Sequence, residues 1–263
     1  AFAAWGVLPI YWKSLDSVQP LVITLHRVFW SFCFLLILLL KAGKLRQTFT
    51  LLRHRRTAAL VLASSLLLSA NWLIFIWAVN RGHMVESSLG YFLNPILNML
   101  TGVILFRERP SALQWLAILL AFLGVGAQVV IFGSFPWIAL GLGCSFAAYG
   151  ALRKIETIDS LPGLFLEAAV IAPVVIVALV WFWASGDTSF TTSLTRSLLL
   201  VCSGVVTTVP LLLFAYAAQR LSLTTVGLTQ YLSPSITLLI GGFMYGETVT
   251  DGQLASFRRI WTS

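Results

Sequence analysis

A few ionisable side chains inside long apolar stretches mark where chemistry could occur. Arg27, with His26 beside it, lies about two helical turns into one apolar run, and Glu167 lies at a similar depth in another. A charge at the centre of a membrane helix costs about 3 kcal/mol on insertion scales, so each group should face protein, water or headgroups. We predict a gating or ion-coupling role for Arg27 and Glu167. Snorkelling of Arg27 to the interface and a direct Arg27–Glu167 pair both stay open.

Two prolines inside apolar runs have neutral polar and aromatic neighbours. Pro95 and Pro234 lack the amide hydrogen that a helix uses, and each frees the carbonyl four residues earlier. In lipid such a carbonyl must face protein or a wet cavity, so it could hold a solute. Kinks made only for packing, and amides that only join helices, are the alternatives. The substrate-binding candidates from these polar rows are Asn71, Trp72, Tyr91, Asn94, Pro95, Asn98, Gln230, Tyr231, Ser233 and Pro234.

Enzymatic and cofactor motifs are not found in the sequence. It has no HExxH, no GxxxxGK[ST], no recognisable Ser, His and Asp arrangement, and no CxxC or Cys/His metal spacing among its three cysteines. We therefore predict a protein that is not an enzyme and that uses no cofactor or metal. The alternatives are a membrane-embedded enzyme and a non-transporting sensor or assembly subunit.

The composition sets the solvent in which these residues work. Of 263 residues, 59% are hydrophobic and 10% charged, against about 25% charged in a soluble domain. The pattern predicts an all-α integral membrane protein of about ten helices, with the first and last runs too short to span. The runs cover residues 1 to 12, 21 to 40, 57 to 79, 85 to 106, 112 to 132, 134 to 152, 163 to 184, 196 to 218, 223 to 245 and 252 to 263.

The net charge of +8 reports topology rather than nucleic-acid binding. Basic residues gather between Lys41 and Arg56, and alternate loops hold eleven Lys or Arg on one side against three on the other. Because cytoplasmic loops are rich in Lys and Arg, both termini should be cytoplasmic in a bacterial inner membrane.

An internal repeat organises the chain. With an offset of 139 residues, Arg81, Pro95 and Glu108 fall on Arg220, Pro234 and Glu247. Five predicted spans separate the copies, so the second copy should cross the membrane in the opposite sense. The predicted repeats are residues 1–132 and 133–263, an arrangement typical of secondary transporters.

The paired motifs allow a family comparison. Gly90-Tyr-Phe-Leu-Asn-Pro95, Phe106-Arg-Glu-Arg-Pro110, Leu161-Pro-Gly-Leu-Phe-Leu-Glu167 and Leu228-Thr-Gln-Tyr-Leu-Ser-Pro234 resemble RarD-type permeases of the EamA branch of the drug/metabolite transporter superfamily. The resemblance implies ten helices in five-plus-five inverted repeats, a central cavity, cytoplasmic termini and transport of small metabolites or drugs. It also implies that Trp5 and Tyr149 lie on cavity-lining helices.

Some features depart from that pattern or stay open. Arg258 and Arg259 stand where the resemblance calls for an apolar last helix, and both end helices are predicted to be truncated. Glu108 and Glu247 are predicted as solvated helix-end acids, with proton coupling as the alternative. The expected partners are a small-molecule solute and the lipid bilayer, with no nucleic acid. A coupling proton or ion and a homodimer are left open.

Overall fold

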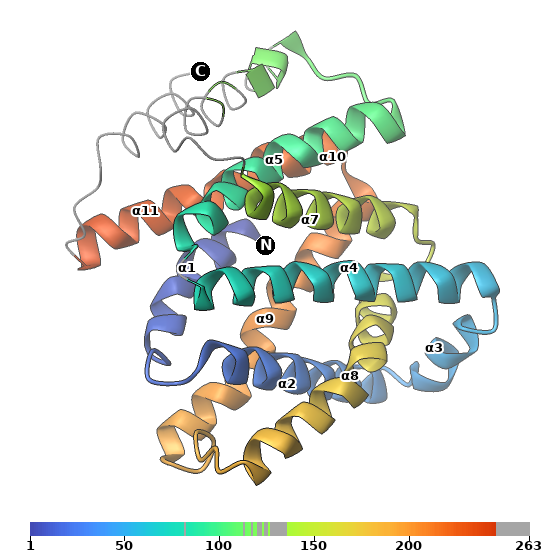
Figure 1. Cartoon of the computed structure of the whole chain (residues 1–263). Coiled ribbons are helices and arrows are strands. Elements are labelled where there is room, and N and C mark those ends of the chain that lie inside the picture. Colours follow the sequence, from blue (N-terminus) through green and yellow to red (C-terminus); the bar gives the residue numbers. More distant parts are fainter. Residues whose placement is uncertain are drawn as a thin grey trace. The chain divides into compact units, whose positions relative to one another are not determined.

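In the part of the chain described by the computed structural model, α-helices account for all the regular secondary structure (Figure 1). The structure describes residues 1–81, 83–112, 114–116, 118–119, 123, 126 and 136–245. Its helices are α1 (Phe2–Lys13), α2 (Pro20–Lys41), α3 (Leu45–Leu51), α4 (Arg55–Asn80), α5 (Met84–Phe106), α7 (Trp137–Ile155), α8 (Ser160–Ala184), α9 (Leu194–Arg220), α10 (Leu223–Gln230) and α11 (Leu232–Tyr245). The all-α prediction is confirmed.

Four of the described helices are long and apolar enough to cross a membrane: Pro20–Lys41, Arg55–Ala78, Ser160–Ala184 and Leu194–Arg220. On α8, Val174, Val177 and Trp181 are 70%, 70% and 62% exposed and follow one another at helical spacing. An outward apolar stripe of this kind suits lipid, because hydrocarbon replaces the protein interior as its solvent.

The 139-residue repeat reappears in the helix boundaries. Adding the offset to Arg55 and Met84 gives 194 and 223, where α9 and α10 begin. The sequence did not indicate α3, which lies inside the basic segment from Lys41 to Arg56. The division at residue 132 stays a prediction, as do the last apolar run, Glu247, Arg258 and Arg259, which lie outside the described residues.

The two proline segments have different structures, although the repeat relates them. Helix α5 continues through Pro95, whereas its counterpart breaks at Tyr231 into α10 and α11, and Pro234 lies in the first turn of α11. A proline in the first turn loses no helical hydrogen bond, because the amides there have no intrahelical partner. Because α11 begins just before it, Pro234 avoids the lost backbone hydrogen bond that Pro95 causes inside α5.

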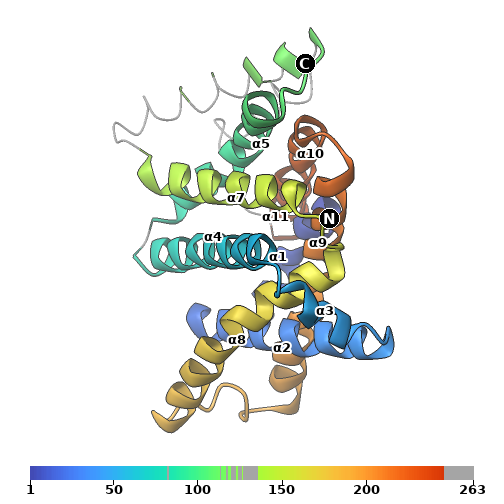
Figure 2. The same ribbon diagram turned by 90° about the vertical axis from the view of Figure 1, so that its right-hand side faces the viewer.

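The chain divides into two compact units, each drawn from both sequence halves. Unit 1 comprises Ala1, residues 10–69 and residues 152–219. Within it α2 packs against α8 (Figures 1 and 2), with the Phe32 and Phe165 rings stacked at 5.6 Å. Helix α9 approaches α2 at Gly204, whose carbonyl accepts a 3.1 Å hydrogen bond from Ser31 Oγ.

Unit 2 comprises residues 2–9, 70–151 and 220–263, and some of these lie outside the described residues. Its core joins α5 to α10 (Figures 1 and 2), and Leu93, Ile96 and Met99 bury their side chains there. A Cβ added at Gly227 of α10 would lie 2.6 Å from the Pro95 carbonyl oxygen. Glycine at that position therefore permits the two backbones to meet.

Gly204→Ala tests the close approach of α9 to α2. A Cβ there would lie 2.6 Å from the Ser31 nitrogen, which is backbone and cannot rotate away. We expect a loss of about 1–3 kcal/mol, as for overpacking elsewhere, measured as a lower thermal midpoint of the purified protein. The control is Gly141→Ala, where the nearest atom is at 3.5 Å. Equal midpoints for the two variants would contradict the packing.

Candidate functional site

Buried amide side chains link α5 to α10 in unit 2. Asn98 Nδ2 donates a 3.0 Å hydrogen bond to Gln230 Oε1, and the two residues are 0% and 7% exposed. The Oδ1 atoms of Asn94 and Asn98 are buried and have no hydrogen-bond partner among the residues that the structure describes. Residues four apart share a helix face, so both oxygens lie on one side of α5. Because buried polar atoms are normally paired, these acceptors suit a ligand that donates hydrogen bonds.

The break between α10 and α11 lies directly beside this amide pair. Tyr231, at the break, is buried, and Ser233 and Pro234 begin α11. Helix α1 packs against the same segment: a Cβ at Gly6 would lie 3.0 Å from the Ser233 carbonyl oxygen. Thr237 Oγ1 also donates a 3.2 Å hydrogen bond to the Gly6 carbonyl. Interrupted backbone and buried amides therefore occur together at this point of unit 2.

The aromatic candidates are joined by a residue that the sequence did not indicate. Phe146 lies between Trp5 and Tyr149, with ring centroids at 6.1 and 6.0 Å respectively. Tyr149 is completely buried and Trp5 is partly buried. Phe146 lies three residues before Tyr149, a helical spacing that could have revealed it.

The remaining substrate-binding candidates are Asn71, Trp72 and Tyr91. Asn71 Nδ2 donates to the Leu142 carbonyl at 2.8 Å and to Ser145 Oγ at 2.9 Å, so it joins α4 to α7, as the packing alternative predicts. Trp72, the next residue, is partly buried. The Tyr91 side chain lies outside the described part of the structure.

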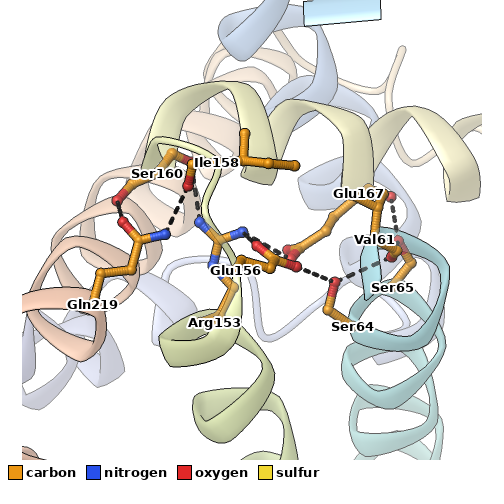
Figure 3. Close-up of polar contacts among 9 residues, drawn as sticks. All are labelled: Val61, Ser64, Ser65, Arg153, Glu156, Ile158, Ser160, Glu167 and Gln219. Atoms are coloured by element: carbon orange, nitrogen blue, oxygen red, sulfur yellow. Dashed lines mark hydrogen bonds and ion pairs between the residues drawn. The ribbon is translucent and has the colours of Figure 1, made fainter. Parts of the chain in front are cut away.

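A charged cluster lies in unit 1 (Figure 3). Arg153 Nη1, near the end of α7, donates to Glu156 Oε2 and, at 3.2 Å, to Glu167 Oε1. The three side chains are at most 1% exposed. Ser64 Oγ of α4 donates to Glu156 Oε1 at 3.3 Å. Arg153, Glu156 and Glu167, which we name the charged triad, therefore connect three helices.

Uncharged groups hold the loop between α7 and α8, which carries Glu156 of the triad. Gln219 Nε2 of α9 donates to the Ile158 carbonyl at 2.7 Å, and Ser160 Oγ donates to Gln219 Oε1 at 3.1 Å (Figure 3). A Cβ at Gly163 of α8 would collide with the Arg153 guanidinium. Gln219 therefore holds the α7–α8 loop from α9, and Gly163 leaves room on α8 for the Arg153 guanidinium.

The triad changes the interpretation of the ionisable candidates. Glu167 lies against Arg153, whereas Arg27 lies 5.4 Å from the centroid of the Trp12 ring, in a cation–π arrangement. Arg153 counted only as a topology signal in the sequence, and Glu156 was missed. Their separation of three residues at a helix end was the available signal.

The environment of Glu156 favours its neutral form. Burial raises the pKa of the Glu156 carboxyl, while the Arg153 charge and the Ser64 hydrogen bond oppose that rise. Among the described residues, no group of three His, Cys, Asp or Glu side chains lies close enough to hold a metal ion.

Glu108 joins α5 to α10 as a cap. Its Oε1 accepts from the Leu223 nitrogen at 2.8 Å, and its Oε2 accepts from the Thr224 nitrogen at 2.9 Å and Thr224 Oγ1 at 2.8 Å. A carboxylate at a helix N-terminus satisfies otherwise unpaired amides and complements the helix dipole. The predicted position at a helix end is observed, but the prediction that the acid is solvated is wrong, because the carboxylate is partly buried and bound to α10.

Long apolar helices with outward apolar side chains, together with polar groups buried among them, define a polytopic membrane protein. The EamA-like transporter family matches residues 1–129 and again residues 135–257. The chain belongs to the EamA-like transporter family, within the drug/metabolite transporter superfamily, and is by that membership a membrane transporter.

Several curated relatives extend over nearly the whole chain. An "Uncharacterized transporter" of Vibrio cholerae is 43% identical, covering 100% of this chain and 87% of the relative. "Protein RarD" of Escherichia coli K12 is 40% identical, covering 100% and 89%. "Chloramphenicol-sensitive protein RarD" of Pseudomonas aeruginosa is 30% identical, covering 97% and 86%. The predicted family is confirmed.

Solved structures share the fold, and one of them is a crystal structure of a protein. It superposes with a TM-score of 0.72 at 16% identity, covering 98% of this chain and 90% of that chain. At this identity the comparison supports the fold alone.

A double-mutant cycle tests the Asn98–Gln230 link. We expect Asn98→Ala and Gln230→Ala to be coupled by about 0.6–1.7 kcal/mol, the range for hydrogen bonds between membrane helices. Unfolding of the two single variants and the double variant in mixed micelles gives the coupling. Strictly additive losses would contradict the bond.

Glu108→Ala tests the cap on α10. Because three donors lose their acceptor, we expect a loss of about 1–2 kcal/mol, with a smaller loss in Glu108→Gln, which keeps one acceptor oxygen. Thermal unfolding gives the comparison. The control is Arg109→Ala, an exposed neighbour that should change little; losses as large as that of Glu108→Ala would count against the cap.

Proposed function

We propose that the chain is a secondary permease of the bacterial inner membrane that moves a small organic solute by alternating access, with both termini cytoplasmic. The solute class is an amino acid, a related metabolite or a drug. Family membership supports transport, and the Lys and Arg asymmetry of the loops supports the orientation. Membership in a transporter family also fits the prediction that the protein is not an enzyme.

The observation that carries the proposal is the pair of unpartnered oxygens on α5. Among the described residues neither Asn94 Oδ1 nor Asn98 Oδ1 has a hydrogen-bond partner, both are buried, and Asn98 is itself bonded to Gln230, the last residue before the break at Tyr231. An acceptor buried without a partner costs about 1–3 kcal/mol, which a donor on the solute would recover. An ammonium, amide or hydroxyl group is the matching chemistry. The buried ring of Tyr231, at the break, would contact the apolar part of such a solute.

Uptake into proteoliposomes tests this site. The panel contains amino acids, related metabolites and amphenicol drugs, the last because one relative is named chloramphenicol-sensitive. We expect saturable uptake by the unmodified protein. In Asn94→Leu and Asn98→Leu, uptake at low solute concentration should fall about tenfold, because one binding hydrogen bond is worth about 1.4 kcal/mol.

The matched control is Thr101→Val, one turn further along α5. Its hydroxyl donates to the Leu97 carbonyl of its own helix, so its removal should leave uptake unchanged. Unchanged uptake in folded Asn94→Leu and Asn98→Leu would overturn the site. No uptake of any solute by folded protein would overturn the permease and favour a sensor subunit or membrane enzyme.

A further inference from the structure

The charged triad brings two carboxylates to one nitrogen. Both Glu156 and Glu167 accept hydrogen bonds from Nη1 of Arg153, so the two acids are neighbours (Figure 3). All three side chains are at most 1% exposed. Two carboxylates that share a site repel each other, and in that situation one of them holds a proton more strongly than an isolated acid does.

We propose that the triad is a proton-binding site in which Glu156 and Glu167 share one exchangeable proton, and that its occupancy couples proton movement to solute transport. The coupling part rests on the proposed function. Loading takes a proton from water onto one carboxylate to give a carboxylic acid, and unloading returns it to water. No other covalent bond forms or breaks, and no co-reactant is needed.

The groups around the two acids come from every helix packed on them. Arg153 of α7 carries the positive charge that faces them, α4 contributes the Ser64 and Ser65 hydroxyls, and α9 contributes the Gln219 amide. Helices α2 and α3 meet α8 through Phe32 and Phe49, which both pack on Phe165. On those helices, Arg27 lies over Trp12 and Arg46 is exposed.

Protonation changes the hydrogen bonds between helices as well as the charge. As a carboxylate, Glu156 accepts from both Arg153 and Ser64. As an acid it has a donor of its own and a weaker capacity to accept, so its hydrogen bonds to Arg153 and Ser64 change in strength or direction. Because Ser64 belongs to α4 and Arg153 to α7, the proton alters a link between two helices. A bistable link of this kind is what coupling requires.

The direction of titration agrees with this geometry. Burial raises the pKa of Glu156, although Arg153 and Ser64 counteract the effect. An acid whose pKa is raised in the folded state binds its proton more tightly there, so low pH loads the site and rising pH empties it.

Infrared spectroscopy of the full chain in lipid nanodiscs tests the proton site without any solute. Lowering the pH should produce the carbonyl band of a protonated carboxylic acid, with a midpoint above the ordinary glutamate value of about 4.3. Glu156→Gln and Glu167→Gln should each remove that band. The matched control Glu108→Gln removes a partly buried carboxylate from unit 2 and should keep it.

Folding is checked by size exclusion and thermal midpoint. If Glu156→Gln does not fold, Glu156→Asp should keep a band with a shifted midpoint. An ordinary glutamate midpoint in the unmodified protein would overturn the site. A band that persists in both triad variants would do the same.

Transport tests the coupling separately. For a solute that passes the uptake test, an imposed proton gradient should accelerate uptake by the unmodified protein. Glu156→Gln and Glu167→Gln should lose this acceleration but keep solute exchange without a gradient. Acceleration that survives in both variants overturns coupling through the triad. If no solute is transported, the proposed function fails, while the infrared band still decides whether the proton site exists.

Discussion

Every backbone polar group inside a membrane must find its partner within the protein, and the helices of this chain follow from that constraint. An unpaired group in hydrocarbon costs several kcal/mol, so apolar runs become continuous helices. One exception is the interrupted helix at Tyr231. The segment around Pro234 separates into α10 and α11, whereas the equivalent segment around Pro95 stays continuous. The same pattern thus has two solutions in one molecule.

Polar side chains in the described helices fall into groups with different physical roles. Asn71 Nδ2 donates two hydrogen bonds to α7, which is the behaviour of a group that joins helices. Asn94 and Asn98 each keep a buried oxygen without a partner, which is costly unless something else binds there. Arg153 and its two carboxylates are extensively bonded, but their state depends on protonation. Hydrogen bonding, rather than polarity alone, therefore distinguishes Asn71 from Asn94 and Asn98.

Much of the fold could be predicted because periodic apolar length is written directly in the sequence. The apolar runs over residues 196–218 and 223–245 predicted the position of α9 and the start of α10, although the second run is divided into α10 and α11, and the family resemblance was confirmed. The candidate site was harder, because its members meet through tertiary contacts. Arg153 counted as a loop charge, and Glu156 carried no motif, since nothing local indicates that both approach Glu167. The break at Tyr231 was equally hidden, because Pro95 offers the same local signal.

The carboxylate of Glu108 has a mechanical consequence. It extends from just beyond α5 to the first amides of α10, and Gly227 lets the α10 backbone approach Pro95 further along. These two contacts fasten the helices at separate points, so sliding or tilting one against the other would break both. Helices α5 and α10 should therefore move together as one rigid unit. A hinge between these two helices is not expected, whereas the interruption after Gln230 separates α11 from the continuous helix of α10.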